Sequence, residues 1–437
     1  MEFNRNVYLE RLKAREKNSL IKIITGCRRA GKSYLLNEIF YDYLVKKGIP
    51  ESNVIKFAFD SDEDIDFLER YFPAEETKIF QKNGSYLINA KKFRAFIKER
   101  TNDSEDFYLL LDEVQMLENF VGTLNSYLRH KNFDIYVTGS NSKFLSSDIV
   151  TEFKGRGTEI HILPLAFSEY CEGLGLSPET AWKTYVVYGG IPLVALMKTE
   201  EEKVSYLKNL CEETYLKDII QHNGIRKQTE LSETFDMLSS MIGTPVNALK
   251  LANTFKSITK KNITDSTITT FVEYLENAFV VSKARKFNIK GKKYISSPVK
   301  IYFEDIGVRN ARLNFRQIEE THIMENIIYN ELRYRGFSVD AGEVSVSEKT
   351  ERIDANGKNI YVQKSLEVDF IATLGSRKQY IQSALSIDSA EKSVQEKKSL
   401  YYIDDSFEKV IVTKNGLKPI QDEKGVVTMD LFDFLLQ

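Results

Sequence analysis

The sequence predicts an α/β fold that begins with a parallel sheet covered by helices. Apolar runs at residues 20–25, 106–111 and 134–138 have the length of buried strands, and each ends in glycine or polar residues. Amphipathic stretches of helical spacing lie between them. Because the chain has 437 residues, which exceeds one ordinary core, we expect two to three domains.

Composition indicates a compact protein and excludes several classes. Hydrophobic residues make up 42% of the chain, so disorder is not predicted. The net charge is −2, so the chain as a whole lacks the positive charge typical of nucleic-acid-binding proteins. The 3 cysteines show no CxxC spacing and the 4 histidines are scattered, which disfavours disulfide frameworks and zinc sites. The charged N-terminus lacks the apolar core of a signal peptide, and no run reaches the roughly 18 apolar residues of a membrane helix. We therefore expect a cytoplasmic protein without membrane contact.

The first apolar run leads into Gly26-x4-Gly31-Lys32-Ser33, which matches the P-loop pattern. Glycines allow a tight turn whose N–H groups approach phosphate oxygens, and a following helix directs its positive N-terminus at the same phosphates. Lys32 is expected to bind the β and γ phosphates of ATP, and Ser33 to bind Mg²⁺. The predicted ATP-contacting set is Gly26, Arg29, Ala30, Gly31, Lys32, Ser33 and Tyr34.

The second run ends in Asp112 and Glu113, a Walker B arrangement. A buried parallel strand would deliver Asp112 beside Mg²⁺, and Glu113 would activate the attacking water. The third run ends near Asn141, which is expected either to contact the γ-phosphate or to form a plain polar turn. Arg156, between two glycines, either neutralises charge on the γ-phosphate or belongs to a surface turn. Arg28, beside Arg29, is open to phosphate contact, neighbour-subunit contact or plain solubility.

Three further stretches carry a family resemblance. They are VTGSNSKFLSSDIVTEFKGRGTEIHILPLAFSEY from residue 137, YGGIPLV at 188–194 and TYLKDII at 214–220. The chain resembles a bacterial and archaeal family of AAA-type ATPases in which the ATPase is joined to a C-terminal domain of unassigned function. We expect a P-loop ATPase domain at 1–165 and, from the successive helical patterns that follow, a helical lid region at 166–228. The resemblance leaves the biological role open.

Residues 229–300 predict a winged helix, because three short helices precede a strand-turn-strand. The final hairpin is strongly basic and contains no acid over residues 283–300. A basic wing suits either duplex DNA or a protein-docking face, and both readings stay open. Its basic residues are Lys283, Arg285, Lys286, Lys290, Lys292, Lys293 and Lys300.

Residues 301–437 resemble the restriction-endonuclease-like fold in the order of their elements. That resemblance places Glu325 (or Glu331) on a helix and Asp369 on a strand as metal ligands. The expected E-x-K is absent, because Gln382 and Ala384 stand in its place. A neutral amide and a methyl group supply neither a metal charge nor a catalytic cation, so we expect no nuclease activity.

Two functions follow from these patterns. The first is an ATP-driven switch that relays its nucleotide state through a winged helix to a C-terminal binding domain and a protein partner. The second is an ATP-gated DNA-binding or DNA-cleaving protein. An assembly of identical copies is compatible with both.

Overall fold

The structure is a computed structural model that describes residues 3–81, 84–139, 153, 155–259, 263–353, 359–387, 389–414, 416 and 418–437. It divides into two compact units. Unit 1 comprises Met1–Pro164, Lys217–Gly224 and Asn277–Phe279, and unit 2 comprises Leu165–Leu216, Ile225–Glu276 and Val280–Gln437.

Unit 1 contains the predicted parallel sheet, which has five strands in the order β2-β5-β6-β1-β7. All four neighbouring pairs are parallel. Because β6 lies between β1 and β5, the carboxyl ends of these three strands are adjacent. The strands are β1 (Ile21–Thr25), β2 (Val54–Ala58), β5 (Phe107–Asp112), β6 (Phe133–Thr138) and β7 (Gly157–His161).

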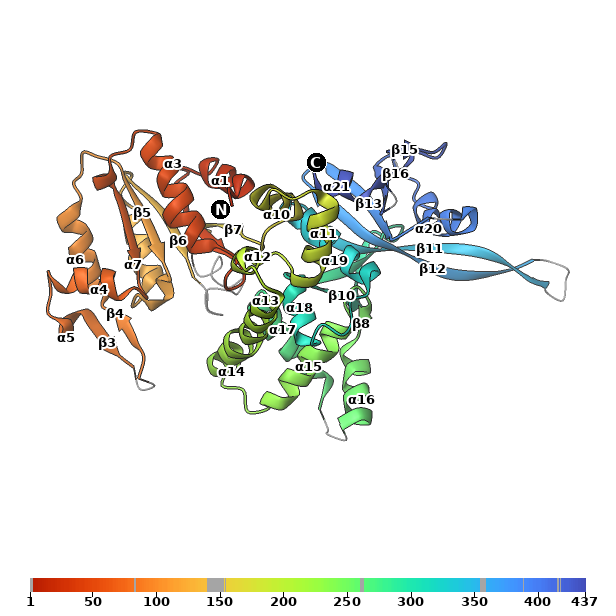
Figure 1. The fold of residues 1–437 in the computed structure, drawn as a ribbon, viewed down its shortest axis with the longest axis horizontal. Helices are drawn as coiled ribbons and strands as arrows, with labels where there is room; N and C mark the ends of the chain where they lie inside the picture. Colours follow the sequence, from red (N-terminus) through yellow and green to blue (C-terminus); the bar gives the residue numbers. More distant parts are fainter. Residues whose placement is uncertain are drawn as a thin grey trace. The chain divides into compact units, whose positions relative to one another are not determined.

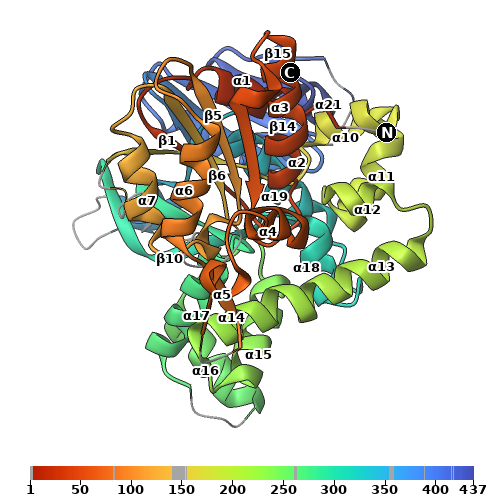
Figure 2. The same ribbon diagram turned by 90° about the vertical axis from the view of Figure 1, so that its left-hand side faces the viewer.

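Helices cover both faces of this sheet (Figures 1 and 2). On one face α4 (Asp62–Glu69), α6 (Ala90–Arg100) and α7 (Phe120–Tyr127) contribute to one apolar core with alternate strand residues. On the other face Phe40 packs against Tyr136, with ring centroids 4.5 Å apart. That face carries α1 (Asn6–Lys13) and the helix after the P-loop, which runs through α2 (Lys32–Tyr34), a π-helical segment (Leu35–Phe40) and α3 (Tyr41–Lys46). The charged insertion also holds α5 (Ala74–Thr77) and the hairpin β3 (Lys78–Phe80) and β4 (Tyr86–Ile88).

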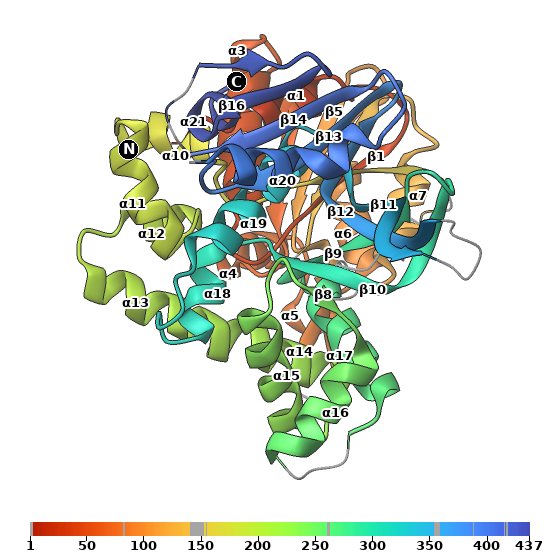
Figure 3. The same ribbon diagram turned by 90° about the vertical axis from the view of Figure 1, so that its right-hand side faces the viewer.

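Unit 2 is built on a nine-stranded sheet with the order β15-β16-β14-β13-β12-β11-β9-β10-β8 (Figure 3). Its first helices are α10 (Phe167–Leu174), α11 (Pro178–Tyr188), α12 (Pro192–Leu196) and α13 (Glu200–Asn209). Helix α13 continues through a π-helical segment (Leu210–Leu216) into α14 (Lys217–Asn223), which belongs to unit 1. One unbroken helical run therefore crosses the unit boundary.

Residues 228–303 follow the element order expected for a winged helix. The elements are α15 (Gln228–Ser240), β8 (Pro245–Val246), α16 (Ala248–Thr259), α17 (Asp265–Asn277), β9 (Val281–Asn288) and β10 (Lys293–Phe303). Strand β10 pairs antiparallel with both β8 and β9. The predicted apolar stripe of α17 is buried, at Ile268, Phe271, Val272 and Leu275.

The division predicted between residues 300 and 301 does not separate two domains. It lies inside β10, a single strand, and β9 pairs in parallel with β11 (Ser338–Ile353). The hairpin therefore belongs to the same sheet as the C-terminal segment. Local sequence could not reveal this, because strand pairing joins residues more than 50 positions apart.

The rest of unit 2 packs helices on both sides of its sheet. Helix α19 (Glu320–Tyr334) stacks Tyr329 on Tyr302 of β10 at 4.3 Å, and α20 (Ala390–Tyr401) joins the apolar core of the other face. The strands β11 and β12 (Asn359–Leu374) form a long ribbon, visible in Figure 1. The remaining elements are α18 (Ile306–Arg312), β13 (Arg377–Ala384), β14 (Glu408–Thr413), β15 (Ile420–Gln421), β16 (Val426–Asp430) and α21 (Leu431–Leu435).

Candidate nucleotide-binding site

The loop from β1 to α2 requires its two glycines for different reasons. Gly26 has φ of 141°, and a Cβ there would lie 2.2 Å from the carbonyl oxygen of Ile162. Gly31 has φ of 97° at the start of α2. Side-chain-bearing residues rarely adopt either conformation. The loop geometry is therefore set by backbone freedom at both ends.

Lys32 lies buried at the centre of this loop. Its Nζ donates to the carbonyl oxygens of Gly26 at 2.9 Å and Cys27 at 3.0 Å. Burial lowers the pKa of Lys32, while the thiol of Cys27 and the carboxylates of Glu113 and Asp112 oppose that shift. A phosphate group would offer this ammonium charged acceptors in place of neutral carbonyls, which are the weaker partners.

Asp112 is positioned at the end of β5 by two neutral donors. Thr138 Oγ1, at the end of β6, donates to Asp112 Oδ1, and Asn37 Nδ2 donates to Oδ2 at 3.4 Å. Neither donor was predicted. The sequence signal for Thr138 was its place at the end of a strand, because parallel strand ends meet at one edge of the sheet.

Glu113 has a left-handed backbone with φ of 51°. Its amide N–H donates to Asp112 Oδ1 at 3.1 Å and lies 3.3 Å from Thr138 Oγ1. The side chain accepts a hydrogen bond from Gln115. Residues with side chains adopt this backbone at a cost, and such strain is concentrated at functional sites.

Asp60, just beyond β2, is a third carboxylate at this edge. Desolvation and then the negative charges of Glu113 and Asp112 raise the pKa of Asp60. The three groups therefore lie within electrostatic reach of one another. Sequence reasoning missed Asp60 because it belongs to a charged insertion without a motif.

The predicted ATP-contacting residues all lie in the loop or the first turn of its helix. Ala30 is fully buried, Arg29 and Ser33 are exposed, and Tyr34 is 39% exposed. The predicted Asn141 lies outside the described residues.

Arg156 is separated from the phosphate loop. Arg156 directly precedes β7. Its carbonyl oxygen accepts from the amide of Ile21 at 2.9 Å, so Arg156 lies beside the first residue of β1. The P-loop follows Thr25 at the other end of β1, roughly 13 Å away at about 3.3 Å per residue. The sequence-based role of Arg156 at the γ-phosphate of its own chain therefore does not fit this placement.

Arg28 contacts a residue far along the chain. Its Nε lies 2.7 Å from Oδ2 of Asp218 on α14, within unit 1. Burial and the charge of Glu113 raise the pKa of Asp218, and Arg28 opposes that shift. Asp218 thus lies near both the P-loop and the Walker B carboxylate.

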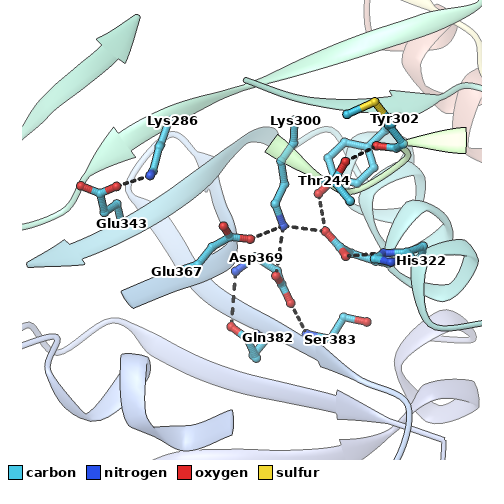
Figure 4. A network of polar contacts seen from close by, with 12 residues as sticks. Thr244, Lys286, Lys300, Tyr302, His322, Glu343, Glu367, Asp369, Gln382 and Ser383 are labelled. Atoms are coloured by element: carbon cyan, nitrogen blue, oxygen red, sulfur yellow. Dashed lines mark hydrogen bonds and ion pairs between the residues drawn. The ribbon is translucent and has the colours of Figure 1, made fainter. Parts of the chain in front are cut away.

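In unit 2 the structure brings together the predicted Glu325 and Asp369, with Lys300 between them. Figure 4 shows Lys300 beside Asp369 and Glu367. Lys300 Nζ lies 2.8 Å from Glu325 Oε1 and 3.2 Å from Asp369 Oδ1. The alternative Glu331 is elsewhere, paired with Arg335 at 2.8 Å. Burial and then the charge of Asp369 raise the pKa of Glu325 to about 7.

The predicted basic wing loses part of its charge to acids supplied by other elements. Lys283 pairs with Glu276 of α17 at 2.7 Å, and Lys286 pairs with Glu343 of β11. Lys300 is buried. The exposed basic residues are Arg285, Lys290, Lys292 and Lys293. The basic charge of the predicted wing is therefore only partly available to a partner, because a count along the sequence does not include the acids that other elements bring to Lys283, Lys286 and Lys300.

A parallel sheet with this strand order, a phosphate loop after β1 and carboxylates after β5 defines a P-loop NTPase domain. Residues 18–171 match the family model described as an AAA domain, and residues 179–319 match a domain of unknown function, DUF8612. The first segment thus matches an AAA domain, and the predicted resemblance to AAA-type ATPases is confirmed.

Relatives of similar length occur in distant organisms. An uncharacterized protein of Haemophilus influenzae is 29% identical, covering 99% of this chain and 98% of its own length. One from Methanocaldococcus jannaschii is 27% identical over 90% of this chain and 84% of its own length. Among solved structures, AMPPCP-bound DnaA from Aquifex aeolicus is 17% identical, covers 63% of this chain and 88% of its own, and has a TM-score of 0.31. The Aeropyrum pernix ORC1 protein in complex with DNA is 12% identical over 72% of this chain and 93% of its own, with a TM-score of 0.32. None of the described helices is long and apolar enough to cross a membrane.

Proposed function

We propose that the chain is an Mg²⁺-dependent ATP hydrolase that works as a switch. The observation that carries the proposal is that the Lys32 ammonium after β1 lies within electrostatic reach of the Asp112 and Glu113 carboxylates after β5, at the same edge of the sheet with only β6 between the two strands. That arrangement provides a cation for phosphate oxygens and a carboxylate for water in one small volume. Both are needed for phosphoryl transfer to water.

Each residue has a distinct part in this proposal. Lys32 exchanges its carbonyl contacts for the β and γ phosphates, and Glu113 orients and deprotonates the attacking water. Mg²⁺ fits the donor set of Ser33 and Asp112, which offers a hydroxyl and a carboxylate oxygen, and when bound it supplies charge to the phosphates. Asn141 and, in a neighbouring copy, Arg156 remain candidates for the γ-phosphate.

The relay to unit 2 is supported by Arg28 and Asp218. Arg28 belongs to the P-loop, and Asp218 belongs to α14, whose helical run continues into unit 2. Nucleotide phosphates compete with the Asp218 carboxylate for the guanidinium, because both are anionic acceptors for arginine. Nucleotide binding would thus release α14 and change the state of the chain that follows it.

The hydrolysis is tested by two substitutions. Lys32→Ala should weaken nucleotide binding, measured with a fluorescent ATP analogue. Glu113→Gln should keep binding and lower phosphate release by about 10²–10⁴-fold, because only the base is lost. Glu118→Gln, a half-buried carboxylate five residues further along the chain that accepts from the amide of Ala90, is the matched control and should leave the rate unchanged. Wild-type turnover by Glu113→Gln would overturn the assignment.

A second candidate function is favoured by the hairpin turn. Lys290, Lys292 and Lys293 are exposed there and would bind phosphate of duplex DNA, in an ATP-gated manner. Against this, α17 exposes Asp265 and Glu273 and its sequence contains no basic residue. We therefore place protein docking before DNA contact.

A further inference from the structure

A buried ammonium lies among three carboxylates in unit 2. Besides Glu325 and Asp369, Lys300 Nζ contacts Glu367 Oε1 at 2.5 Å. An ammonium has three hydrogens, so one for each carboxylate satisfies the whole group. The side chain of Lys300 is 4% exposed, and those of Glu325 and Asp369 are 9% and 10% exposed. This cation is therefore held inside the protein and is not a solvated surface charge.

The carboxylates are fixed from behind by further hydrogen bonds. Tyr302 OH donates to Glu325 Oε1 at 2.6 Å, and the amide of Ser383 donates to Asp369 Oδ2 at 2.9 Å. A Cβ on Gly243 would lie 2.9 Å from Glu325 Oε2, so the backbone there approaches the carboxylate closely. The carboxylates of Glu325 and Asp369 are thus preorganised around a cation, whereas the side chain of Glu367 is 40% exposed.

Gln382 contributes no charge to this cluster. Its Oε1 accepts from the Asp369 amide at 3.4 Å, so the side chain is turned to the backbone. Gln382 lies on β13, which ends at Ala384, so neither position supplies a charged group. The only cation in contact with Asp369 among the described residues therefore comes from β10, 69 positions earlier.

We propose that Lys300 is the resident cation of this cluster and fills the place that a hard divalent metal ion would take. Carboxylates held in this way are the ligands that Mg²⁺ and Mn²⁺ prefer. In the described part of the chain no group of three or more His, Cys, Asp or Glu side chains is arranged to hold a metal ion, and the Lys300 ammonium lies between these carboxylates. The chain has thus replaced an exchangeable ion by a tethered one.

The replacement has a structural consequence. Lys300 lies on β10, whereas its partners lie on α19 and β12. The ion pairs therefore tie the hairpin of residues 281–303 to the C-terminal segment without any metal. This inference is independent of the proposed ATP hydrolysis.

The test counts Mn²⁺ bound per full-length chain, by electron paramagnetic resonance of free Mn²⁺ in a titration without nucleotide. Lys300→Met should bind one Mn²⁺ more than the wild type, and Lys300→Met/Asp369→Asn should lose that gain. Any Mn²⁺ held near Asp112 is common to all variants and cancels in the comparison. Added Mn²⁺ should raise the unfolding midpoint of Lys300→Met and not that of the double variant.

A second measurement does not depend on the folding of Lys300→Met. Asp369→Asn in the otherwise wild-type chain should leave the Mn²⁺ count unchanged, because the place is already filled. Loss of a bound Mn²⁺ in Asp369→Asn would show that the wild-type cluster holds a metal and would overturn the proposal. Absence of any gain in a folded Lys300→Met would overturn it as well.

Discussion

Arg28 of the P-loop and Asp218 of α14 form an ion pair with an Nε to Oδ2 distance of 2.7 Å. The two side chains are 37% and 38% exposed, so water screens the pair. Such pairs contribute at most about 1 kcal/mol. That weakness suits the proposed relay, in which nucleotide phosphate would break this contact.

We expect Asp218→Ala to uncouple the helical run from the nucleotide. ATP should change the protease sensitivity of residues 210–228 in the wild type, whereas the variant should show the released pattern with and without ATP. Nucleotide affinity should rise no more than about fivefold, the equivalent of a screened ion pair. Limited proteolysis with mass spectrometry measures the first effect. Gln221→Ala, an exposed change on the same helix, is the control, and an ATP response retained by Asp218→Ala would contradict the relay.

The P-loop and Walker B residues could be predicted because their signals are local. All residues of the P-loop motif lie within eight consecutive positions, and Asp112 directly follows an apolar strand. Asp218 could not be predicted as a site residue, because it is far from Arg28 in the sequence and the two residues meet only in the folded chain. The distance of Arg156 from its own P-loop could not be predicted for a related reason, because the sequence shows that Arg156 follows the third strand and does not show at which end of the sheet it lies.

Lys300 shows the same limit in unit 2. It ends a run of lysines, so along the chain it counts as part of a basic surface. In the fold it turns inward to Glu325 and Asp369, residues 25 and 69 positions away. Alternation along a strand indicates which side chains share a face, but the acids on that face come from other elements.

Asp305 packs its buried carboxylate against the two glycines of the YGGIP stretch, residues 188–192. Its carboxylate accepts from the amides of Gly190 at 2.7 Å and Val308 at 2.9 Å, and a Cβ on Gly189 would lie 2.3 Å from it. We expect Asp305→Ala to lower the free energy of unfolding by roughly 3 kcal/mol or more, because several buried N–H groups lose their acceptor. Denaturant unfolding measures this. Asp404→Ala, a loop carboxylate in the same unit, should cost far less, and equal losses would contradict the role.

The same carboxylate makes stability depend on pH. Burial raises the pKa of Asp305 to about 6, although the backbone hydrogen bonds oppose the shift. A raised folded-state pKa means that the folded protein binds the proton more tightly than the unfolded chain does. The contribution of Asp305 to the free energy of unfolding therefore falls as pH rises from about 4 to about 6. Asp305→Asn removes the titration, and the difference in unfolding free energy between it and the wild type should change across that window. A constant difference would contradict the shift.

The hairpin turn provides a test of DNA contact. If duplex DNA binds there, replacement of Lys290, Lys292 and Lys293 by glutamate should abolish binding. Wild-type affinity should then fall with salt at a log–log slope of about −0.9 for each phosphate contact. Fluorescence anisotropy with a labelled duplex measures both. Replacement of Lys283 and Lys286, which already face acids, is the matched control; binding that ignores salt or survives the triple change would favour a protein-docking hairpin.

The last expectation concerns cleavage, where fold order and site chemistry point in different directions. The resemblance in element order assigns Glu325 and Asp369 to the metal ligands of a nuclease, but Gln382 is neutral and turned to the backbone, and Lys300 lies between the two carboxylates. Loss of a single charge-stabilising group from a catalytic site costs on the order of a hundredfold or more in rate. We therefore expect no cleavage of linear, supercoiled or branched DNA with Mg²⁺ or Mn²⁺, with or without ATP. Gel assays that compare the wild type with Asp369→Ala decide the matter. A contaminating nuclease would cut equally in both preparations, whereas metal-dependent nicking present in the wild type and absent in Asp369→Ala would mean that the carboxylates bind a catalytic metal despite Lys300.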